Sequence, residues 1–308
     1  VVEPEVYGTQ VDTEVLEKKV EEYITEFKDE LNMLDEGCYT LPKYTSDSPE
    51  VQAACDTMNE YLKASITYKM KENVVVDKTL ISEWLSYDEN MNVTFDEDKV
   101  KEWMREFGKT YDTVGSTRTI TTPTGKTVNV SGGTYGWSVD EATEATALIE
   151  SIKKGEVIEK EPTYVQTAAT HDAQDWGSTY AEVDVTTQHM WYIVNGAVVL
   201  ETDVVTGKPT PDRVTPTGVY SILELKRNKT LTGTIPATGK PIYETPVSYW
   251  MRVTWTGVGF HDAIWQSAFG GTIYQTNKGS HGCINMPLNM AASLYDQLSV
   301  GTPVIIHE

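Results

Sequence analysis

One cysteine near the carboxyl end of the chain is close in sequence to two histidines. Cys283 follows His281 by two residues with Gly282 between them, and His261 lies further upstream. A thiol becomes a strong nucleophile only as a thiolate, and a neighbouring imidazole can accept its proton. These residue types at this spacing therefore predict a cysteine nucleophile with a histidine base.

We assign the base to His261 because it ends the strand-like run Val258–His261, a rigid place for an oriented side chain. Its second ring nitrogen needs a hydrogen-bond acceptor, and both the carbonyl and the carboxylate of Asp262 are candidates. On an extended strand His281 and Cys283 point to one face, so His281 is a polar neighbour of the thiolate or a structural residue.

Gly282 is expected to let the backbone turn so that amide N–H groups point toward an oxyanion. The N–H groups of Gly282 and Cys283 are the predicted oxyanion hole. A buried structural cysteine is the alternative for Cys283. The compact order Ser280-His281-Gly282-Cys283 favours catalysis, because it places polar, nucleophilic and glycine residues in one turn.

The order of these residues resembles the signature of the L,D-transpeptidase catalytic domain, the YkuD family. The resemblance rests on His261, a spacer, and then Ser280-His281-Gly282-Cys283-Ile284-Asn285. The stretches VTGK at 205–208 and TPTGVY at 215–220 resemble the family's paired strands. The resemblance covers about residues 178–307 and implies that Cys283 is the nucleophile and His261 the base.

The reaction that this resemblance implies is the formation of 3-3 cross-links in peptidoglycan. Cys283 would attack the peptide bond between the third, diamino-acid residue and the D-alanine of a stem tetrapeptide, and would form a thioester. The side-chain amine of a second stem is the implied acceptor, whereas water as acceptor would give an L,D-carboxypeptidase. Carbapenems are the expected inhibitors, and no cofactor is implied.

Several residues around the motif are candidates for binding the substrate. Ser280 and Asn285 belong to the motif, and Trp265 and Tyr243 are aromatic candidates near the groove, although a large aromatic residue more often packs in a core. The stretches 226–246 and 262–279 are expected to be lids over the groove.

The C-terminal part of the chain has the alternating pattern of β-strands from residue 178 onward. Asn195-Gly196 between two strand-like runs is a strong hairpin signal, and only 288–298 has a helical pattern. We therefore expect residues 178–308 to form a mainly-β catalytic domain, a sandwich or a barrel, of the L,D-transpeptidase type.

Residues 1–158 read as an α+β module, with a helix expected over 11–36 and a hairpin around 123–126. The stretches Tyr111–Thr113 and Gly132–Trp137 resemble a peptidoglycan-binding domain found upstream of L,D-transpeptidases in Gram-positive bacteria. The alternative is that these glycines only form a tight turn. Residues 159–177 are the expected linker.

Composition narrows the classes of function. The chain has 308 residues, which suits two or three domains, and a net charge of -21, with most of the excess in residues 1–160. Such acidity argues against nucleic-acid binding. No apolar run is long enough to cross a membrane. We expect a place at the outer face of the membrane or in the cell wall of a Gram-positive bacterium, anchored by an N-terminal segment outside this sequence.

The remaining cysteines leave two alternatives open. Cys38 and Cys55 form a disulfide or are small buried side chains. There is no C-x-x-C pair, which argues against a thiolate zinc site. A zinc hydrolase using His261, His281 and Cys283 is a further alternative, but no carboxylate or further histidine lies at ligand spacing, so we expect no metal site. A non-catalytic cell-wall-binding protein is the other alternative to an enzyme.

Overall fold

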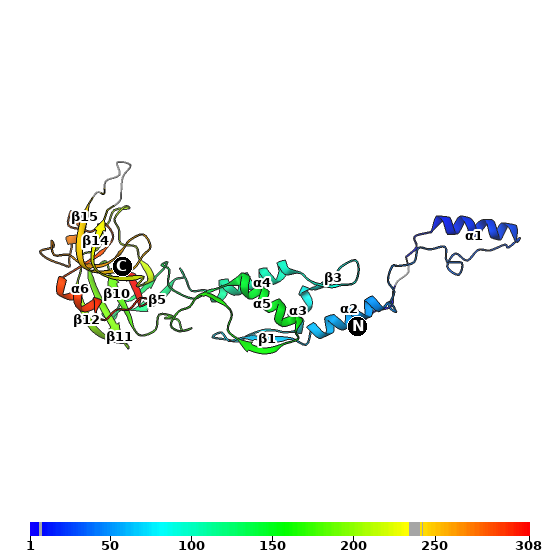
Figure 1. Cartoon of the computed structure of the whole chain (residues 1–308), viewed down its shortest axis with the longest axis horizontal. Helices are drawn as coiled ribbons and strands as arrows, with labels where there is room; N and C mark the ends of the chain where they lie inside the picture. Colours follow the sequence, from blue (N-terminus) through cyan, green and yellow to red (C-terminus); the bar gives the residue numbers. More distant parts are fainter. Residues whose placement is uncertain (6–7, 234–240, 242) are drawn as a thin grey trace. The chain divides into compact units, whose positions relative to one another are not determined.

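The computed structural model describes residues 1–5, 8–233, 241 and 243–308 (Figure 1). The chain divides into two compact units. The first consists of residues 1–69, 73–104 and 142–161, and the second of residues 70–72, 105–141 and 162–308.

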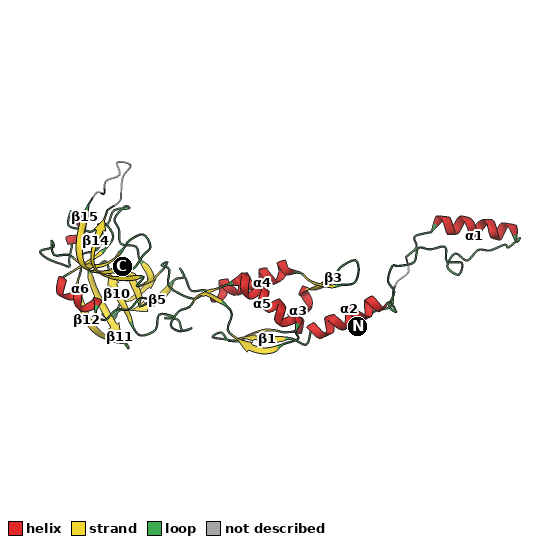
Figure 2. Cartoon of the chain, in the orientation of Figure 1, coloured by secondary structure: helices red, strands yellow, loops and turns green. Residues whose placement is uncertain are grey.

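The first unit combines helices with short strands, which confirms the α+β prediction (Figure 2). Its sheet has the order β2-β1-β8, and β3 pairs with β4. The elements that lie in it or begin or end in it are α1 (Thr13–Thr25), α2 (Pro49–Tyr61), β1 (Ser65–Tyr68), β2 (Val74–Val76), α3 (Lys78–Trp84), β3 (Leu85–Tyr87), β4 (Val93–Phe95), α4 (Glu97–Tyr111), α5 (Glu141–Lys153) and β8 (Val157–Lys160). Inside it, Glu144 accepts hydrogen bonds from Tyr68 and from Lys160, each at 2.7 Å.

The helix predicted over residues 11–36 is wrong in its length. α1 ends at Thr25, and Phe27 has a φ of 56°, in the left-handed region. None of the residues of α1 is buried. Apolar residues at helical spacing stabilise a helix mainly by packing against other elements. Because no residue of α1 is buried, this pattern does not stabilise a helix beyond Thr25.

The first unit repeats a helix–strand pattern. α2 and α5 each have 13 residues and each lead into a four-residue strand, β1 and β8. These two strands pair in parallel, with Ser65 opposite Val157. The sequences KVEEYITEF at 19–27 and KVKEWMREF at 99–107 also share their Lys, Val, two Glu and Phe positions. The strands that follow α2 and α5 therefore lie side by side in one sheet.

The second unit contains two main sheets, as the sandwich prediction requires. The five-stranded sheet has the order β12-β11-β10-β18-β13, and the four-stranded sheet has the order β14-β15-β16-β17. The elements are β10 (Tyr180–Asp184), β11 (His189–Val194), β12 (Ala197–Asp203), β13 (Gly218–Ser221), β14 (Glu224–Thr232), β15 (Glu244–Arg252), β16 (Gly259–Asp262), η1 (Ile273–Gln275), β17 (Ile284–Met286), α6 (Leu288–Tyr295) and β18 (Pro303–His307).

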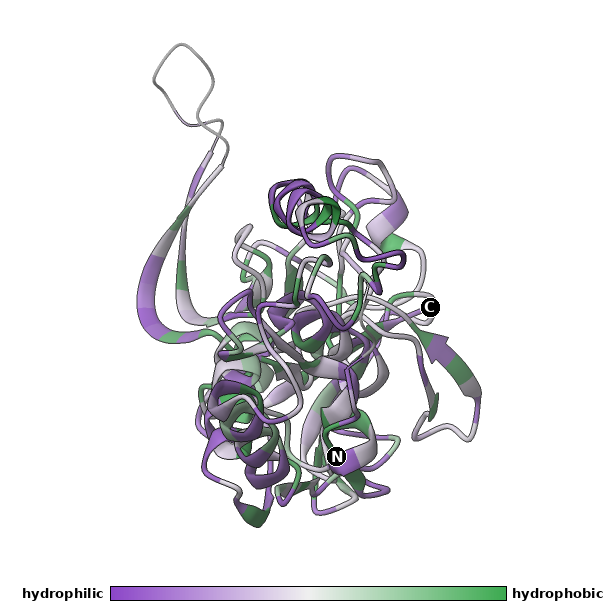
Figure 3. Ribbon diagram, turned by 90° about the vertical axis from the view of Figure 1, so that its right-hand side faces the viewer, coloured by the Kyte–Doolittle hydropathy of each residue, from purple (hydrophilic) through white to green (hydrophobic). Residues whose placement is uncertain are grey.

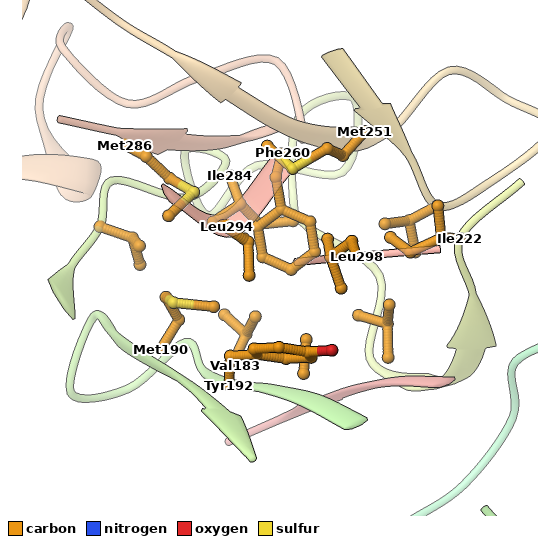
Figure 4. Packing of buried hydrophobic residues seen from close by; sticks show 14 of the residues in the cluster. Val183, Met190, Tyr192, Ile222, Met251, Phe260, Ile284, Met286, Leu294 and Leu298 are labelled. Atoms are coloured by element: carbon orange, nitrogen blue, oxygen red, sulfur yellow. The ribbon is translucent and has the colours of Figure 1, made fainter. Parts of the chain in front are cut away.

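The main core lies between these two sheets. Figure 4 shows Met251, Phe260 and Ile284 on one side, facing Val183 and Met190 of the five-stranded sheet on the other. All five side chains are completely buried. Because side chains alternate along a strand, the neighbours of Phe260 and Ile284 face away from this core.

A hairpin packs on the five-stranded sheet in a second core. The hairpin is formed by β5 (Arg118–Thr121) and β6 (Thr127–Val130). A separate two-stranded pair is formed by β7 (Ser138–Val139) and β9 (Tyr164–Gln166). Ile120 and Val130 of the hairpin cluster with Trp176, Val219 and Ile305. Residues 105–141 therefore share a compact unit with residues 162–308, and the predicted linker includes β9 and the buried Trp176. The predicted domain boundaries stay predictions.

β14 and β15 form a long two-stranded arm that rises from the second unit (Figures 1 and 3). The stretch 226–246, which was predicted to be a lid, includes most of β14 and the start of β15. Its residues 234–240 and 242 lie outside the described part of the chain.

The two N-terminal cysteines, Cys38 and Cys55, are free thiols in the structure. No helix in the described residues is long and apolar enough to span a membrane. The described residues also hold no group of three or more His, Cys, Asp and Glu side chains that could bind a metal ion.

Candidate active site

Two neighbouring parallel strands position the predicted base and nucleophile. In the register of β16 and β17, His261 lies opposite Asn285, and Phe260 lies opposite Ile284. Cys283 precedes Asn285 by two residues, so it lies on the same side of the sheet as His261. Phe260 and Ile284 occupy the opposite face, in the core. The strand alternation that buries these two apolar residues thus places the thiol and the imidazole on the same side of the sheet.

Both side chains line one cavity of about 410 Å³. The predicted residues at its wall are His281, Ser280, Asn285, Trp265 and Tyr243, in addition to Cys283 and His261. Six further lining residues were not predicted individually: Leu231, Thr245, Gln266, Asn277, Lys278 and Gly279. Leu231 and Thr245 come from the arm, where they are directly paired, and the other four lie in the stretch 262–279, which was predicted to be a lid.

The hydrogen bonds of His261 decide between the two acceptors that its sequence context offers. Its Nδ1 lies 2.9 Å from the carbonyl oxygen of Asp262. The carboxylate of Asp262 instead accepts two hydrogen bonds, from the backbone N–H groups of Ser248 and Tyr249, each at 2.8 Å. If Nδ1 carries the proton that this carbonyl accepts, Nε2 is free to act as a base.

His261 is 3% exposed, and burial lowers its pKa below the usual value. Its ring lies near those of Trp250 and Trp265, with centroid distances of 6.1 and 5.9 Å. The imidazole is therefore neutral at pH 7, the form that can accept a proton.

Burial has the opposite effect on the thiol and raises the pKa of Cys283 to about 11. Its Sγ lies 3.6 Å from the carbonyl oxygen of Gly257. At neutral pH the resting site therefore holds a thiol and a neutral imidazole, not a preformed ion pair. A base has to remove the proton as the thiol reacts.

The turn of the motif is fixed by its own hydrogen bonds. Ser280 Oγ donates to the Cys283 carbonyl at 2.6 Å and accepts from the Gly282 N–H at 3.1 Å. The Gly282 carbonyl accepts from Thr215 Oγ1 at 2.8 Å. Ser280, predicted to bind substrate, thus uses its hydroxyl inside the motif.

This bonding changes the predicted oxyanion hole. The Gly282 N–H is occupied by Ser280, whereas the Cys283 N–H has no hydrogen-bond acceptor among the described residues. Of the two donors predicted from the sequence, only the Cys283 N–H is available in this structure.

Gly282 nevertheless has to be glycine. Its φ is 110°, in the left-handed region, and an added Cβ would lie 3.2 Å from Val258 Cγ2. Gly207 packs against it so closely that a Cβ on Gly207 would lie 2.9 Å from Gly282 Cα and 1.9 Å from the carbonyl oxygen of Arg213. The backbones of Gly207 and Gly282 therefore pack closely against each other, which only glycine allows.

His281 stands beside Tyr243, with 5.0 Å between the ring centroids. Partial burial lowers the pKa of His281, and the positive charge of Arg213 lowers it further. Asn285 is 3% exposed, lines the cavity, and its Oδ1 has no hydrogen-bond partner among the described residues. His281 is thus a neutral aromatic neighbour of the site, and Asn285 offers an unused acceptor.

Two families match the chain. Residues 178–306 match the L,D-transpeptidase catalytic domain, YkuD, and residues 44–158 match a peptidoglycan binding domain. The first match contains every site residue described above.

Solved structures and curated proteins give the same result. A crystal structure of an Enterococcus faecium L,D-transpeptidase, a cysteine-to-serine mutant, is 35% identical, covers 82% of this chain and 99% of its own, and has a TM-score of 0.67. The Ldtfm-avibactam carbamoyl enzyme is 35% identical, with 83% and 98% covered and a TM-score of 0.68. L,D-transpeptidase 1 of Mycobacterium tuberculosis is 34% identical over 113 residues, 36% of this chain and 43% of that protein. The chain thus spans less than half the length of the curated relatives it matches.

Proposed function

The chain belongs to the L,D-transpeptidase family that carries the YkuD catalytic domain, and we propose that it forms 3-3 cross-links in peptidoglycan through an acyl-enzyme on Cys283. The main support for this proposal is that His261 and Cys283 lie on the same side of the sheet and line one cavity. Burial lowers the pKa of His261, and a neutral imidazole can take the proton of the Cys283 thiol as it attacks.

In the first half-reaction His261 Nε2 takes the proton of Cys283 as Sγ attacks the carbonyl carbon before the D-alanine of a stem tetrapeptide. The oxygen of that carbonyl becomes an oxyanion and accepts a hydrogen bond from the Cys283 N–H. When the C–N bond breaks, His261 returns the proton to the leaving amine of D-alanine. The product is a thioester on Cys283.

In the second half-reaction the side-chain amine of another stem attacks the thioester carbonyl. His261 takes a proton from this amine, the C–S bond breaks, and His261 passes the proton to the departing thiolate. Water in place of the amine gives L,D-carboxypeptidase activity, the alternative with the same catalytic residues.

The rest of the cavity supplies binding. The unpartnered Oδ1 of Asn285 can accept a hydrogen bond from a backbone N–H of the donor stem. The half-exposed Trp265 and the partly buried Tyr243 supply apolar walls. Carbapenems, which also present an acyl group, are proposed to react at the same sulfur.

We further propose that residues 44–158 hold the enzyme on peptidoglycan, in agreement with their family match. The proposed place of action is the cell wall of a Gram-positive bacterium, with a membrane anchor from a segment outside this sequence. The predicted boundaries of 1–158, a linker over 159–177 and 178–308 belong to this proposal.

The test uses purified disaccharide-tetrapeptide and mass spectrometry of the products. The proposal expects a cross-linked dimer with loss of one D-alanine, and no dimer with Cys283→Ala. Tripeptide with no dimer would support the carboxypeptidase alternative, and unchanged tetrapeptide would contradict both.

A further inference from the structure

We propose that Thr215, outside the catalytic motif, is a positioning residue whose hydroxyl aims the Cys283 N–H at the oxyanion. This inference rests on the proposed acyl transfer at Cys283. Thr215 lies in the TPTG stretch at 215–218 and is 2% exposed.

The hydroxyl of Thr215 connects two backbone groups. It accepts a hydrogen bond from the Gly207 N–H at 2.8 Å and donates to the Gly282 carbonyl at 2.8 Å. An N–H group can only donate and a carbonyl can only accept, so the direction of both bonds is fixed. The single proton of Thr215 therefore has to point at Gly282.

Fixing the Gly282 carbonyl also fixes the Cys283 N–H, because both belong to one peptide plane. In a trans peptide the C=O and N–H bonds point in opposite directions. The Cys283 N–H consequently points away from Thr215. A rotation of this plane would turn the donor away from the reacting carbonyl.

The other polar groups of the turn are already used. Ser280 Oγ binds the Gly282 N–H and the Cys283 carbonyl. Gly282 and Cys283 together have four backbone polar groups, and Thr215 binds the Gly282 carbonyl. Three of the four thus have partners, and the Cys283 N–H is the one left without an acceptor among the described residues. Cys283 is partly buried, and an N–H group without an acceptor in such a place suits a site that a substrate oxygen fills.

Thr215 is held by backbone that is itself fixed. Gly207 pairs with Ser280, the Lys208 N–H donates to the Ser280 carbonyl at 3.1 Å, and the Ser280 N–H donates to the Thr206 carbonyl at 3.0 Å. Gly207 also packs closely against Gly282, since a Cβ on Gly207 would lie 2.9 Å from Gly282 Cα. The donor is thus oriented before the substrate arrives, which is the condition for effective electrostatic stabilisation.

The test compares two reactions of the same sulfur in Thr215→Val. Acylation by a carbapenem develops an oxyanion, whereas alkylation by iodoacetamide displaces iodide and develops none. We expect Thr215→Val to slow acylation by about tenfold to hundredfold and to leave alkylation within about twofold of the parent. Thr217→Val is the matched control, since Thr217 is exposed in the same stretch, and it should change neither rate.

Thr215→Ser keeps the hydroxyl and should acylate at close to the parent rate, and this holds even if the valine variant does not fold. Equal losses in both reactions for folded Thr215→Val, an unchanged acylation rate, or a large loss in Thr215→Ser would each overturn the proposal. Near-ultraviolet circular dichroism identifies folded samples. If the parent itself forms no carbapenem adduct, the proposed function fails; an adduct on the parent with an unaffected Thr215→Val variant contradicts only the role of Thr215.

Discussion

The Nδ1 atom of His261 lies 2.9 Å from the carbonyl oxygen of Asp262, its neighbour in the chain. The orienting group of the proposed base is therefore backbone. The adjacent carboxylate, which is the obvious candidate in the sequence, instead holds two backbone N–H groups of β15.

This arrangement predicts a mild effect for Asp262→Asn. The asparagine side chain keeps an oxygen that can accept from Ser248 and Tyr249, and the backbone carbonyl is unchanged. Carbapenem acylation should stay within about threefold of the parent, in contrast to the roughly 10⁴-fold loss typical of a triad carboxylate replaced by an amide. A loss of that size, measured by stopped-flow kinetics, would show that the carboxylate orients the base.

The lowered pKa of His261 predicts a specific pH profile. The base must be neutral, so the acylation rate falls as pH falls through the pKa of His261. Burial places this pKa below the ordinary 6.5, and the acid limb should therefore have its midpoint below pH 6.5 with a plateau at pH 7–8. Single-turnover acylation rates from pH 4.5 to 8 check this, and a midpoint above 6.5 is the contrary result.

The raised pKa of Cys283 predicts that the thiol depends strongly on its base. With a pKa of about 11 it holds little thiolate at pH 8, so His261→Ala should slow iodoacetamide alkylation by about 10²–10⁴-fold at that pH. In this variant the rate should climb with pH toward 11, because hydroxide then supplies the thiolate. Peptide mapping separates Cys283 from Cys38 and Cys55, and alkylation of the partly exposed Cys55 serves as the internal control. A rate at Cys283 that is unchanged at pH 8 would argue for a thiolate formed without His261.

The buried ion pair of the second core predicts a large effect on stability. Arg118 Nη2 lies 2.9 Å from Asp175 Oδ2, and both side chains are less than 5% exposed. Removing one partner leaves a buried charge, so Arg118→Met should lower the free energy of unfolding by about 3–5 kcal/mol. Arg227→Met is the matched control, because its pair with Asp296 at 2.7 Å is exposed, and it should lower that free energy by less than about 1 kcal/mol. Urea titrations of both variants measure the two losses of unfolding free energy. Equal losses would contradict a large stabilising role for the buried pair of Arg118 and Asp175.

Much of the catalytic site could be predicted from the sequence because its residues lie within one turn and one strand. That Cys283 and His261 line one cavity follows from strand alternation and from the register of β16 and β17, which are simple rules. The bond from Ser280 to the Gly282 N–H could not be predicted, because it depends on the exact form of the turn.

Other features depend on contacts between distant segments. Leu231 and Thr245 reach the cavity only through the register of the arm, and Thr215 reaches Gly282 through the packing of Gly207. In the first unit, the helical spacing beyond Thr25 was misleading because burial, which periodicity cannot reveal, is missing from α1.

The most direct test of the central claim is the intact mass of the protein after incubation with a carbapenem. The proposed mechanism predicts a single adduct on the parent chain and none on Cys283→Ala, although that variant keeps the free thiols of Cys38 and Cys55. An adduct of unchanged extent on Cys283→Ala, or none on the parent, would contradict the assignment of Cys283 as the nucleophile.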